Sequence, residues 1–159
     1  LAARSQFSLG IDAFDAPIND SGTDGRFFSW LGQFQWVQQL SPRTLMLARL
    51  NTQLTPNSLL SLEKLSLGGV DTVRGYRQNQ LVSDNGILAS VEFRLPLSDR
   101  LRTLQLTPFF EIGSGWNNST DNPDPGIIAS IGTGLRWQVA PDLNLSLDYG
   151  IPLIGVKDR

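Results

Sequence analysis

The sequence predicts an all-β fold, an antiparallel transmembrane β-barrel to which this chain contributes about seven strands. Three observations predict this fold. Seven segments alternate between apolar and polar residues, the links between these segments are alternately long and short, and the segments are longer than the strands of most soluble proteins. None of the segments has the apolar spacing of an amphipathic helix, so two-faced strands of an antiparallel sheet are expected.

The alternating segments cover residues 1–14, 27–40, 43–56, 87–97, 104–117, 126–140 and 143–153. The clearest of them is 87–97, where Val91 and Phe93 share one face and Glu92 and Arg94 share the other. Strands in soluble proteins are usually about 5–6 residues long, whereas a tilted strand needs about 9–11 residues to cross a bilayer. The lengths therefore favour membrane-spanning strands.

One face of every predicted strand carries no charged residue, and the charges of the strands share the other face. This other face carries Arg4, Asp12, Arg49, Glu92, Arg94, Glu111, Arg136 and Asp148, among others. If the apolar face meets lipid, a one-residue slip in register would place such charges in hydrocarbon, at about 2–4 kcal/mol for an arginine near the midplane. The pattern therefore predicts a strongly specified register.

Alternation alone does not say which face points inward, because a soluble ligand-binding β-barrel has the same pattern with its apolar face lining a pocket. The links favour the membrane protein. Residues 15–26, 57–86 and 118–125 form long links, and residues 41–42, 98–103 and 141–142 form short ones. Successive links of an antiparallel barrel lie at opposite ends, so one rim has tight turns and the other has large loops, as in outer-membrane barrels.

Composition excludes several classes of function. The chain has no Cys and no His, which removes thiolate metal sites, the commonest metal ligand and the commonest general base. A net charge of -2 and a pI near 5.0 give no basic field for nucleic acid. We therefore expect no cofactor, no metal site, no catalytic residue and no nucleic-acid partner. An enzyme that uses Glu92 and Glu111 as an acid/base pair is a further alternative.

The link 57–86 is far longer than a hairpin turn, and ordered links of this length are usually functional. Its many apolar residues predict a loop that folds back against the barrel wall, and Gly68, Gly69 and Gly75 permit tight turns there. An arginine held inside a protein needs an acidic partner, so Arg74 in this loop is expected to pair with a carboxylate of the wall. The candidates on the polar faces of the following strands are Glu92 and Glu111.

The loop resembles the motif region of the two-partner secretion translocators of the outer membrane, the TpsB or haemolysin-activator family. The resemblance is carried by Leu67-Gly68-Gly69, by Val73-Arg74-Gly75-Tyr76, by Val91-Glu92-Phe93-Arg94 with its following proline, and by Pro108-Phe109-Phe110-Glu111-Ile112-Gly113. In the family the motif arginine docks against an acidic residue of a barrel strand. Here Glu111 stands where an aspartate is expected, which adds a methylene to the pair.

The resemblance implies a bacterial outer-membrane location and a monomeric barrel of about sixteen strands, an even number as in other single-chain barrels. It further implies that the barrel exports a large secreted protein client captured by periplasmic POTRA domains. Residues 1–159 are then part of the C-terminal barrel domain, with the POTRA domains and the other strands lying outside this chain. A barrel-assembly protein of the same superfamily is the alternative, because it shares the motif.

Overall fold

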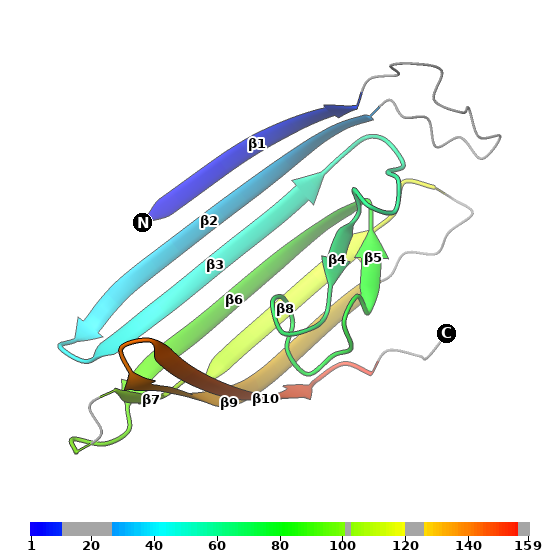
Figure 1. The fold of residues 1–159 in the computed structure, drawn as a ribbon. Coiled ribbons are helices and arrows are strands. Elements are labelled where there is room, and N and C mark those ends of the chain that lie inside the picture. Colours follow the sequence, from blue (N-terminus) through cyan, green and yellow to red (C-terminus); the bar gives the residue numbers. More distant parts are fainter. Residues whose placement is uncertain (11–26, 101–102, 120–125, 156–159) are drawn as a thin grey trace.

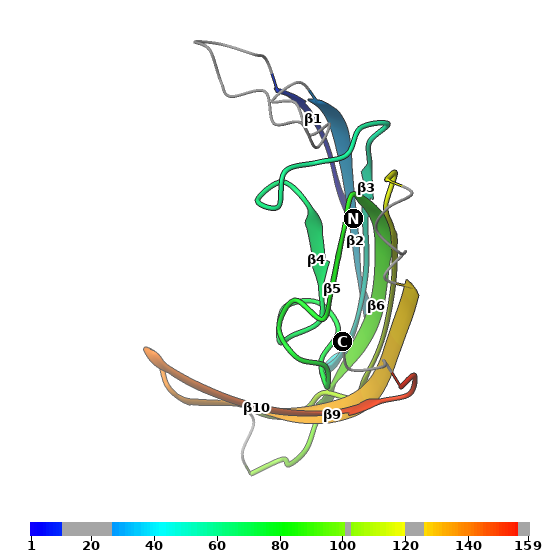
Figure 2. The same cartoon turned by 90° about the vertical axis from the view of Figure 1, so that its right-hand side faces the viewer.

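The computed structural model describes residues 1–10, 27–100, 103–119 and 126–155 as a curved antiparallel sheet with a small hairpin on its concave side (Figure 1 and Figure 2). The strands are β1 (Ala2–Gly10), β2 (Phe27–Ser41), β3 (Thr44–Leu54), β4 (Leu65–Leu67), β5 (Leu81–Ser83), β6 (Asn85–Pro96), β7 (Leu104–Leu106), β8 (Phe109–Trp116), β9 (Gly126–Ala140) and β10 (Leu143–Pro152). In the described part of the chain, no helix is long and apolar enough to cross a membrane.

The strands of the large sheet follow the order β1, β2, β3, β6, β7 together with β8, β9 and β10. β7 and β8 each pair with β6 on one side and with β9 on the other. This confirms the predicted all-β antiparallel fold. Within the described residues β1 pairs only with β2 and β10 only with β9, so the sheet is not closed.

Two details of the strands differ from the prediction. The predicted strand 104–117 is interrupted at Thr107 and Pro108, where Pro108 has no backbone N–H to donate. The register continues through the interruption, because the backbone N–H of Thr107 donates to the carbonyl of Gly134 at 2.9 Å and the N–H of Gly134 donates back at 3.0 Å. The second difference is the β4–β5 hairpin inside the long link, whose three-residue strands are too short to show alternation.

The strand register places the charged side chains of the sheet on one face. Ser90 of β6 pairs with Arg49 of β3 on one side and with Glu111 of β8 on the other. The link 57–86 lies over this concave face (Figure 2), and Glu92 and Glu111 beneath it are only 3% and 4% exposed. Asp12, whose charge was assigned to the same face, lies outside the described residues.

The opposite, convex face is apolar and exposed. Leu147 of β10 is 71% exposed, and Ile131 of β9 and Phe110 of β8 are 49% and 42% exposed. The apolar side chains therefore point away from the concave face, as the membrane interpretation requires and as a soluble barrel with an apolar pocket does not.

A small apolar core joins the long link to the concave face. Leu67, Val73 and Leu81 of the link pack against Leu88 of β6 and Ile128 of β9. Leu59, near the start of the link, is also buried, whereas Leu62 and Val70 are 97% and 67% exposed. The link is thus held to the wall by a few contacts rather than by all of its apolar side chains.

Candidate functional site

The tip of the link is a tight turn that follows β4. Gly68, Gly69 and Gly75 have φ angles of 104°, 104° and 96°. Residues with a Cβ rarely adopt positive φ angles of this size. The hydroxyl of Thr72 accepts a hydrogen bond from the backbone N–H of Gly68 at 2.8 Å and closes the turn. This geometry directs Arg74 toward the sheet.

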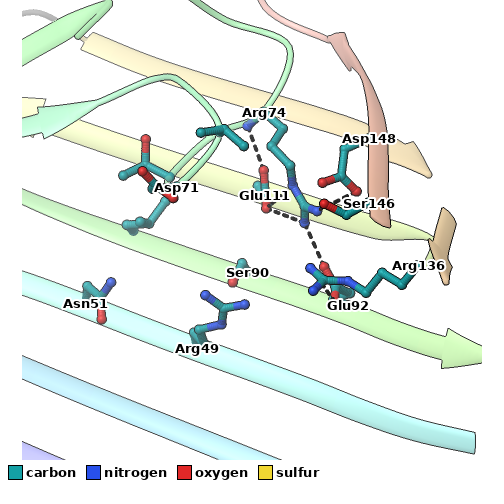
Figure 3. Close-up of a pocket in the computed structure, with 13 residues that line it drawn as sticks. Arg49, Asn51, Asp71, Arg74, Ser90, Glu92, Glu111, Arg136, Ser146 and Asp148 are labelled. Atoms are coloured by element: carbon teal, nitrogen blue, oxygen red, sulfur yellow. Dashed lines mark hydrogen bonds and ion pairs between the residues drawn. The ribbon is translucent and has the colours of Figure 1, made fainter. Parts of the chain in front are cut away.

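Arg74 makes its shortest contacts with Glu111 of β8 (Figure 3). Its Nη2 lies 2.6 Å from Oε1 of Glu111, and its Nε donates to the same oxygen at 2.9 Å. The backbone N–H of Arg74 donates to Oε2 of Glu111 at 2.7 Å. One carboxylate thus holds both the guanidinium and the main chain of the arginine, and charge-assisted hydrogen bonds of this kind are about twice as strong as neutral ones.

Two further carboxylates face the same guanidinium. Nη2 of Arg74 donates to Oε2 of Glu92 on β6 at 3.0 Å, and Nη1 lies 3.3 Å from Oδ1 of Asp148 on β10. Glu92 is shared, because its Oε1 lies 3.4 Å from Nε of Arg94 and 3.7 Å from Nη2 of Arg136. The arginine therefore connects three strands of the sheet to the link.

The surroundings of Arg74 stabilise its charge. Burial disfavours the charged form, but hydrogen bonds and coulombic attraction from Glu111 and then Glu92 outweigh it and raise the pKa of Arg74 above its usual value. The ring of Phe109 adds a cation–π contact, with its centroid 3.5 Å from Cζ of Arg74. Beside the arginine, a polar cavity of about 230 Å³ separates the link from the wall and is lined also by Arg49 and Asp71.

The residues that flank Arg74 contact the last two strands directly. Gly75 lies against Gly150 of β10 so closely that a Cβ on either glycine would come within 2.8 Å of the other's backbone. The hydroxyl of Tyr76 lies 2.8 Å from the carbonyl oxygens of Ala129 on β9 and Ile154 after β10. It also accepts hydrogen bonds from the N–H groups of these two residues at 3.3 and 3.1 Å.

The structure brings together all the residues that the sequence singled out for the site: Gly68, Gly69, Val73, Arg74, Gly75, Tyr76, Glu92 and Glu111. Arg94 lies beside Glu92. Arg74 contacts both candidate carboxylates, Glu92 and Glu111, and not only one of them. Sequence reasoning missed Asp148, Gly150 and Phe109 as contacts of the motif. Their position on the polar face of their strands was the available signal, but alternation does not tell which residues of different strands lie side by side.

The geometry bears on the acid/base alternative and on metal binding. Both carboxylates of that alternative, Glu92 and Glu111, accept hydrogen bonds from Arg74, so neither stands free. Within the described ranges, no group of three or more acidic side chains is arranged to hold a metal ion.

Comparison with known proteins identifies the family. The family model of the haemolysin secretion/activation protein ShlB/FhaC/HecB matches residues 1–137, which include the motif loop, Glu92 and Glu111. The chain belongs to this family. Asp148 and Gly150 lie beyond the matched residues.

The curated relatives of this ShlB/FhaC/HecB chain are outer-membrane transporters. It is 26% identical over 152 residues to the outer membrane transporter CdiB of Escherichia coli O6:K15:H31 (strain 536 / UPEC), and equally similar to a second CdiB from Escherichia coli. Each match covers 88% of this chain and 23% of the relative, so the chain spans about a quarter of their length. The solved structure of CdiB from Escherichia coli matches with a TM-score of 0.72 at 22% identity, covering 96% of this chain and 29% of that one.

Membership in the ShlB/FhaC/HecB family confirms the resemblance drawn from the motifs, and it confirms the bacterial outer membrane as the location. The likeness to CdiB confirms that the curved sheet is a fragment of a larger transmembrane β-barrel. The alternative of a soluble ligand-binding barrel is therefore wrong. The concave face corresponds to the inner face of such a barrel, and the exposed apolar convex face corresponds to its outer face.

Proposed function

We propose that this chain is part of the C-terminal barrel domain of an outer-membrane transporter that exports a large partner protein by two-partner secretion. In this proposal the complete barrel has about sixteen strands, an even number as in other single-chain barrels. POTRA domains that capture the client precede the barrel, and the barrel works as a monomer. The family match and the short coverage of the CdiB relatives support this view.

The observation that carries the proposal is the docking of the motif loop, residues 57–86, on a polar inner face. An unfolded client needs a water-filled pore without apolar surface to which it can adhere. The concave face supplies charged and hydroxyl groups, whereas the exposed apolar side chains lie on the convex face. A loop held inside this path by Arg74 serves as a plug or as the support of a gate.

The role of Arg74 in the proposal is that of an anchor. Removing one partner of a buried, hydrogen-bonded ion pair costs about 3–5 kcal/mol, because the remaining charges are left unpaired. Glu111, Glu92 and Asp148 would all lose this cation in an Arg74→Ala variant. The tip of the loop is therefore expected to leave the wall in most molecules of such a variant.

Export of the client and accessibility of the loop in the Arg74→Ala transporter test the proposal. A matched control is Arg43→Ala, which removes an arginine from a surface ion pair with Asp99 in which the two side chains are 37% and 99% exposed. We expect impaired or leaky export and an accessible loop for Arg74→Ala, and unchanged behaviour for Arg43→Ala. Normal export together with an unchanged loop in Arg74→Ala would refute the proposal.

The barrel-assembly alternative is disfavoured by the family itself, whose model describes secretion and activation of haemolysins. Measuring the level of other barrel proteins in cells that lack the transporter separates the two functions. Two-partner secretion predicts normal levels of those barrels and loss of one secreted client.

A further inference from the structure

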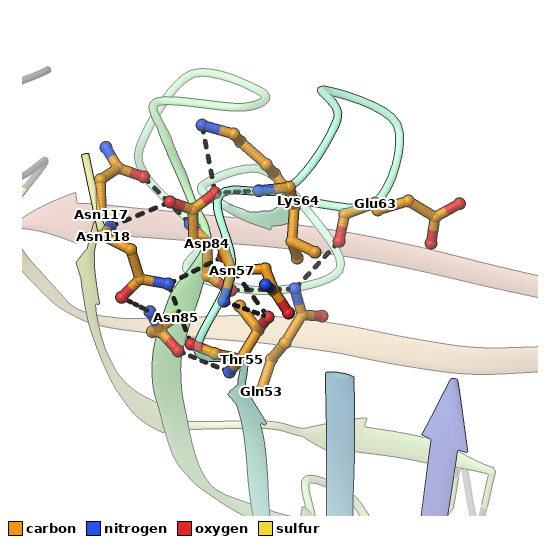
Figure 4. Close-up of polar contacts among 10 residues, drawn as sticks. Gln53, Thr55, Asn57, Glu63, Lys64, Asp84, Asn85, Asn117 and Asn118 are labelled. Carbon is orange, nitrogen blue, oxygen red and sulfur yellow. Dashed lines mark hydrogen bonds and ion pairs between the residues drawn. The ribbon is translucent and has the colours of Figure 1, made fainter. Parts of the chain in front are cut away.

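A second polar cluster lies where the motif loop rejoins the sheet (Figure 4). Its centre is Asp84, which lies between β5 and β6 and is 0% exposed. Oδ1 of Asp84 accepts a hydrogen bond from the backbone N–H of Leu59 at 2.9 Å and lies 3.3 Å from Nζ of Lys64. Oδ2 accepts from the backbone N–H of Asn118 at 3.0 Å. A fully buried carboxylate is thus satisfied by three donors.

Asparagine side chains extend the cluster to neighbouring backbone. Oδ1 of Asn85 accepts from the N–H of Thr55 at 2.7 Å, and Nδ2 of Asn85 donates to Oδ1 of Asn118 at 3.0 Å. Nδ2 of Asn118 donates to the carbonyls of Thr55 and Asn57 at 2.9 and 2.8 Å. Oδ1 of Asn117 accepts from the N–H of Asp84 at 3.0 Å. The cluster therefore joins three stretches of chain: 55–59, where the loop begins, 84–85, where it ends, and 117–118, which follow β8.

The two clusters hold different parts of the loop. Arg74 fastens the tip, and the Asp84 cluster fastens both ends of the loop to each other and to the stretch that follows β8. No residue takes part in both sets of contacts as described above. Because the bonds of Asp84 go to backbone N–H groups and a lysine, their strength depends on the charge of the carboxylate.

We propose that Asp84 is a positioning residue of the transporter, a rim anchor that holds the base of the motif loop to the 117–118 stretch independently of Arg74. The proposal rests on the proposed function, because it takes the loop to be the element that occupies the export path. The base of the loop can leave the wall only if the bonds to the 117–118 stretch break as well. The transporter then has two separate points of loop control, one at the tip and one at the rim.

The Asp84→Asn variant tests the rim anchor with little change of shape. A carboxamide has one acceptor oxygen and presents its NH₂ group to donors, so at least one of Leu59 N–H, Asn118 N–H and the Lys64 ammonium loses its partner. The matched control is Asp99→Asn, because Asp99 is 99% exposed and binds Arg43 at the short-turn rim. A second variant, Lys64→Met, removes the ammonium and leaves both backbone bonds of Asp84 in place.

Hydrogen–deuterium exchange of the full-length transporter in detergent measures each anchor separately. In Asp84→Asn we expect exchange in residues 57–60 and 117–119 to rise about tenfold or more, as loss of a charge-assisted hydrogen bond implies. Residues 73–76 should stay protected. Arg74→Ala should show the reverse pattern, and Lys64→Met should raise exchange at 57–60 by less than Asp84→Asn does.

The ionic current through single transporters in planar bilayers measures how often the pore opens. A change in the stability of the fold alone would not alter this opening frequency. We expect Asp84→Asn to open more often than Asp99→Asn while its folded barrel keeps the heat-modifiable mobility of the wild type on gels. Unchanged exchange at 57–60 and 117–119 in Asp84→Asn, or equal loss of protection at 73–76, would overturn the rim anchor. Neither measurement uses the client, so failure of the proposed export function would appear separately, as normal secretion in Arg74→Ala.

Discussion

The close approach of the motif loop to β10 gives a test of loop docking that leaves every charge in place. In a Gly150→Ala variant the new Cβ would lie 2.7 Å from the carbonyl carbon of Arg74 and 2.8 Å from its oxygen and from the nitrogen of Gly75. Ordinary contact begins near 3.4 Å, so the loop backbone must move by about 0.7 Å to clear the contact of 2.7 Å. The atoms that obstruct it are backbone atoms, which cannot rotate away as a side chain does.

The energetic consequence follows from that displacement. Overpacking by one methyl group costs about 1–3 kcal/mol, which shifts the ratio of undocked to docked loop by about 5- to 150-fold. A movement of this size also lengthens the bonds of 2.6 to 2.9 Å between Arg74 and Glu111 toward the limit of good hydrogen-bond geometry. Both effects favour release of the loop.

The rate of thiol labelling measures this shift. Residues 1–159 contain no cysteine, so within them a Val73→Cys substitution introduces one reporter, at a position that is 0% exposed while the loop is docked. We expect labelling of this cysteine in membranes to be about 5- to 150-fold faster when Gly150→Ala is also present. The control is Gly155→Ala, whose Cβ would have no atom within 4 Å. Equal labelling rates in the two variants would refute the argument that the loop backbone rests on β10.

Three other expectations follow from the same contacts. Tyr76→Phe removes the hydroxyl that binds β9 and the segment after β10, and we expect faster reporter labelling by about 5- to 10-fold, as loss of roughly 1–1.5 kcal/mol implies, with normal membrane assembly. The pKa of Arg74 is raised, so its contribution to docking is fully present below the pKa of the free side chain and is lost only as the pH rises through the higher folded value. Between pH 7 and pH 10, an increase in labelling beyond the rise in the thiolate fraction of the reporter would contradict this. Leu147→Arg places a charge on the convex face, which the proposed function exposes to lipid, at a cost of about 2–4 kcal/mol near the midplane. It should reduce the amount of folded barrel on gels, whereas Asn144→Arg on the concave face of the same strand should not.

The faces of the sheet and the identity of the motif loop could be predicted from the sequence, because both depend on local order along the chain. Alternation placed Glu92 and Glu111 on the inner face, and the link pattern placed the long loops at one rim. Contacts between side chains of different strands depend on the register in which the strands pair. The sequence of one strand does not show this register. For this reason neither Asp148 as a third carboxylate near Arg74 nor the contact of Gly75 with Gly150 could be predicted.

The Asp84 cluster was missed for a related reason. Its members come from the ends of three links, and each of them is an ordinary polar residue of a loop when taken alone. Only the meeting of these link ends in space makes Asp84 a buried carboxylate with three donors. The sequence shows the residues of such a cluster but not the distances that join them.

The hydroxyl of Tyr76 has a mechanical consequence for the barrel wall. It binds backbone groups of Ala129 on β9 and Ile154 after β10, with its one proton serving either carbonyl while its lone pairs accept from the two N–H groups. Sliding of one strand past the other by a single residue displaces these groups by about 3.4 Å, which is more than any hydrogen bond tolerates. While the loop is docked, Tyr76 therefore opposes shear between these neighbouring strands, and release of the loop also frees them to slide.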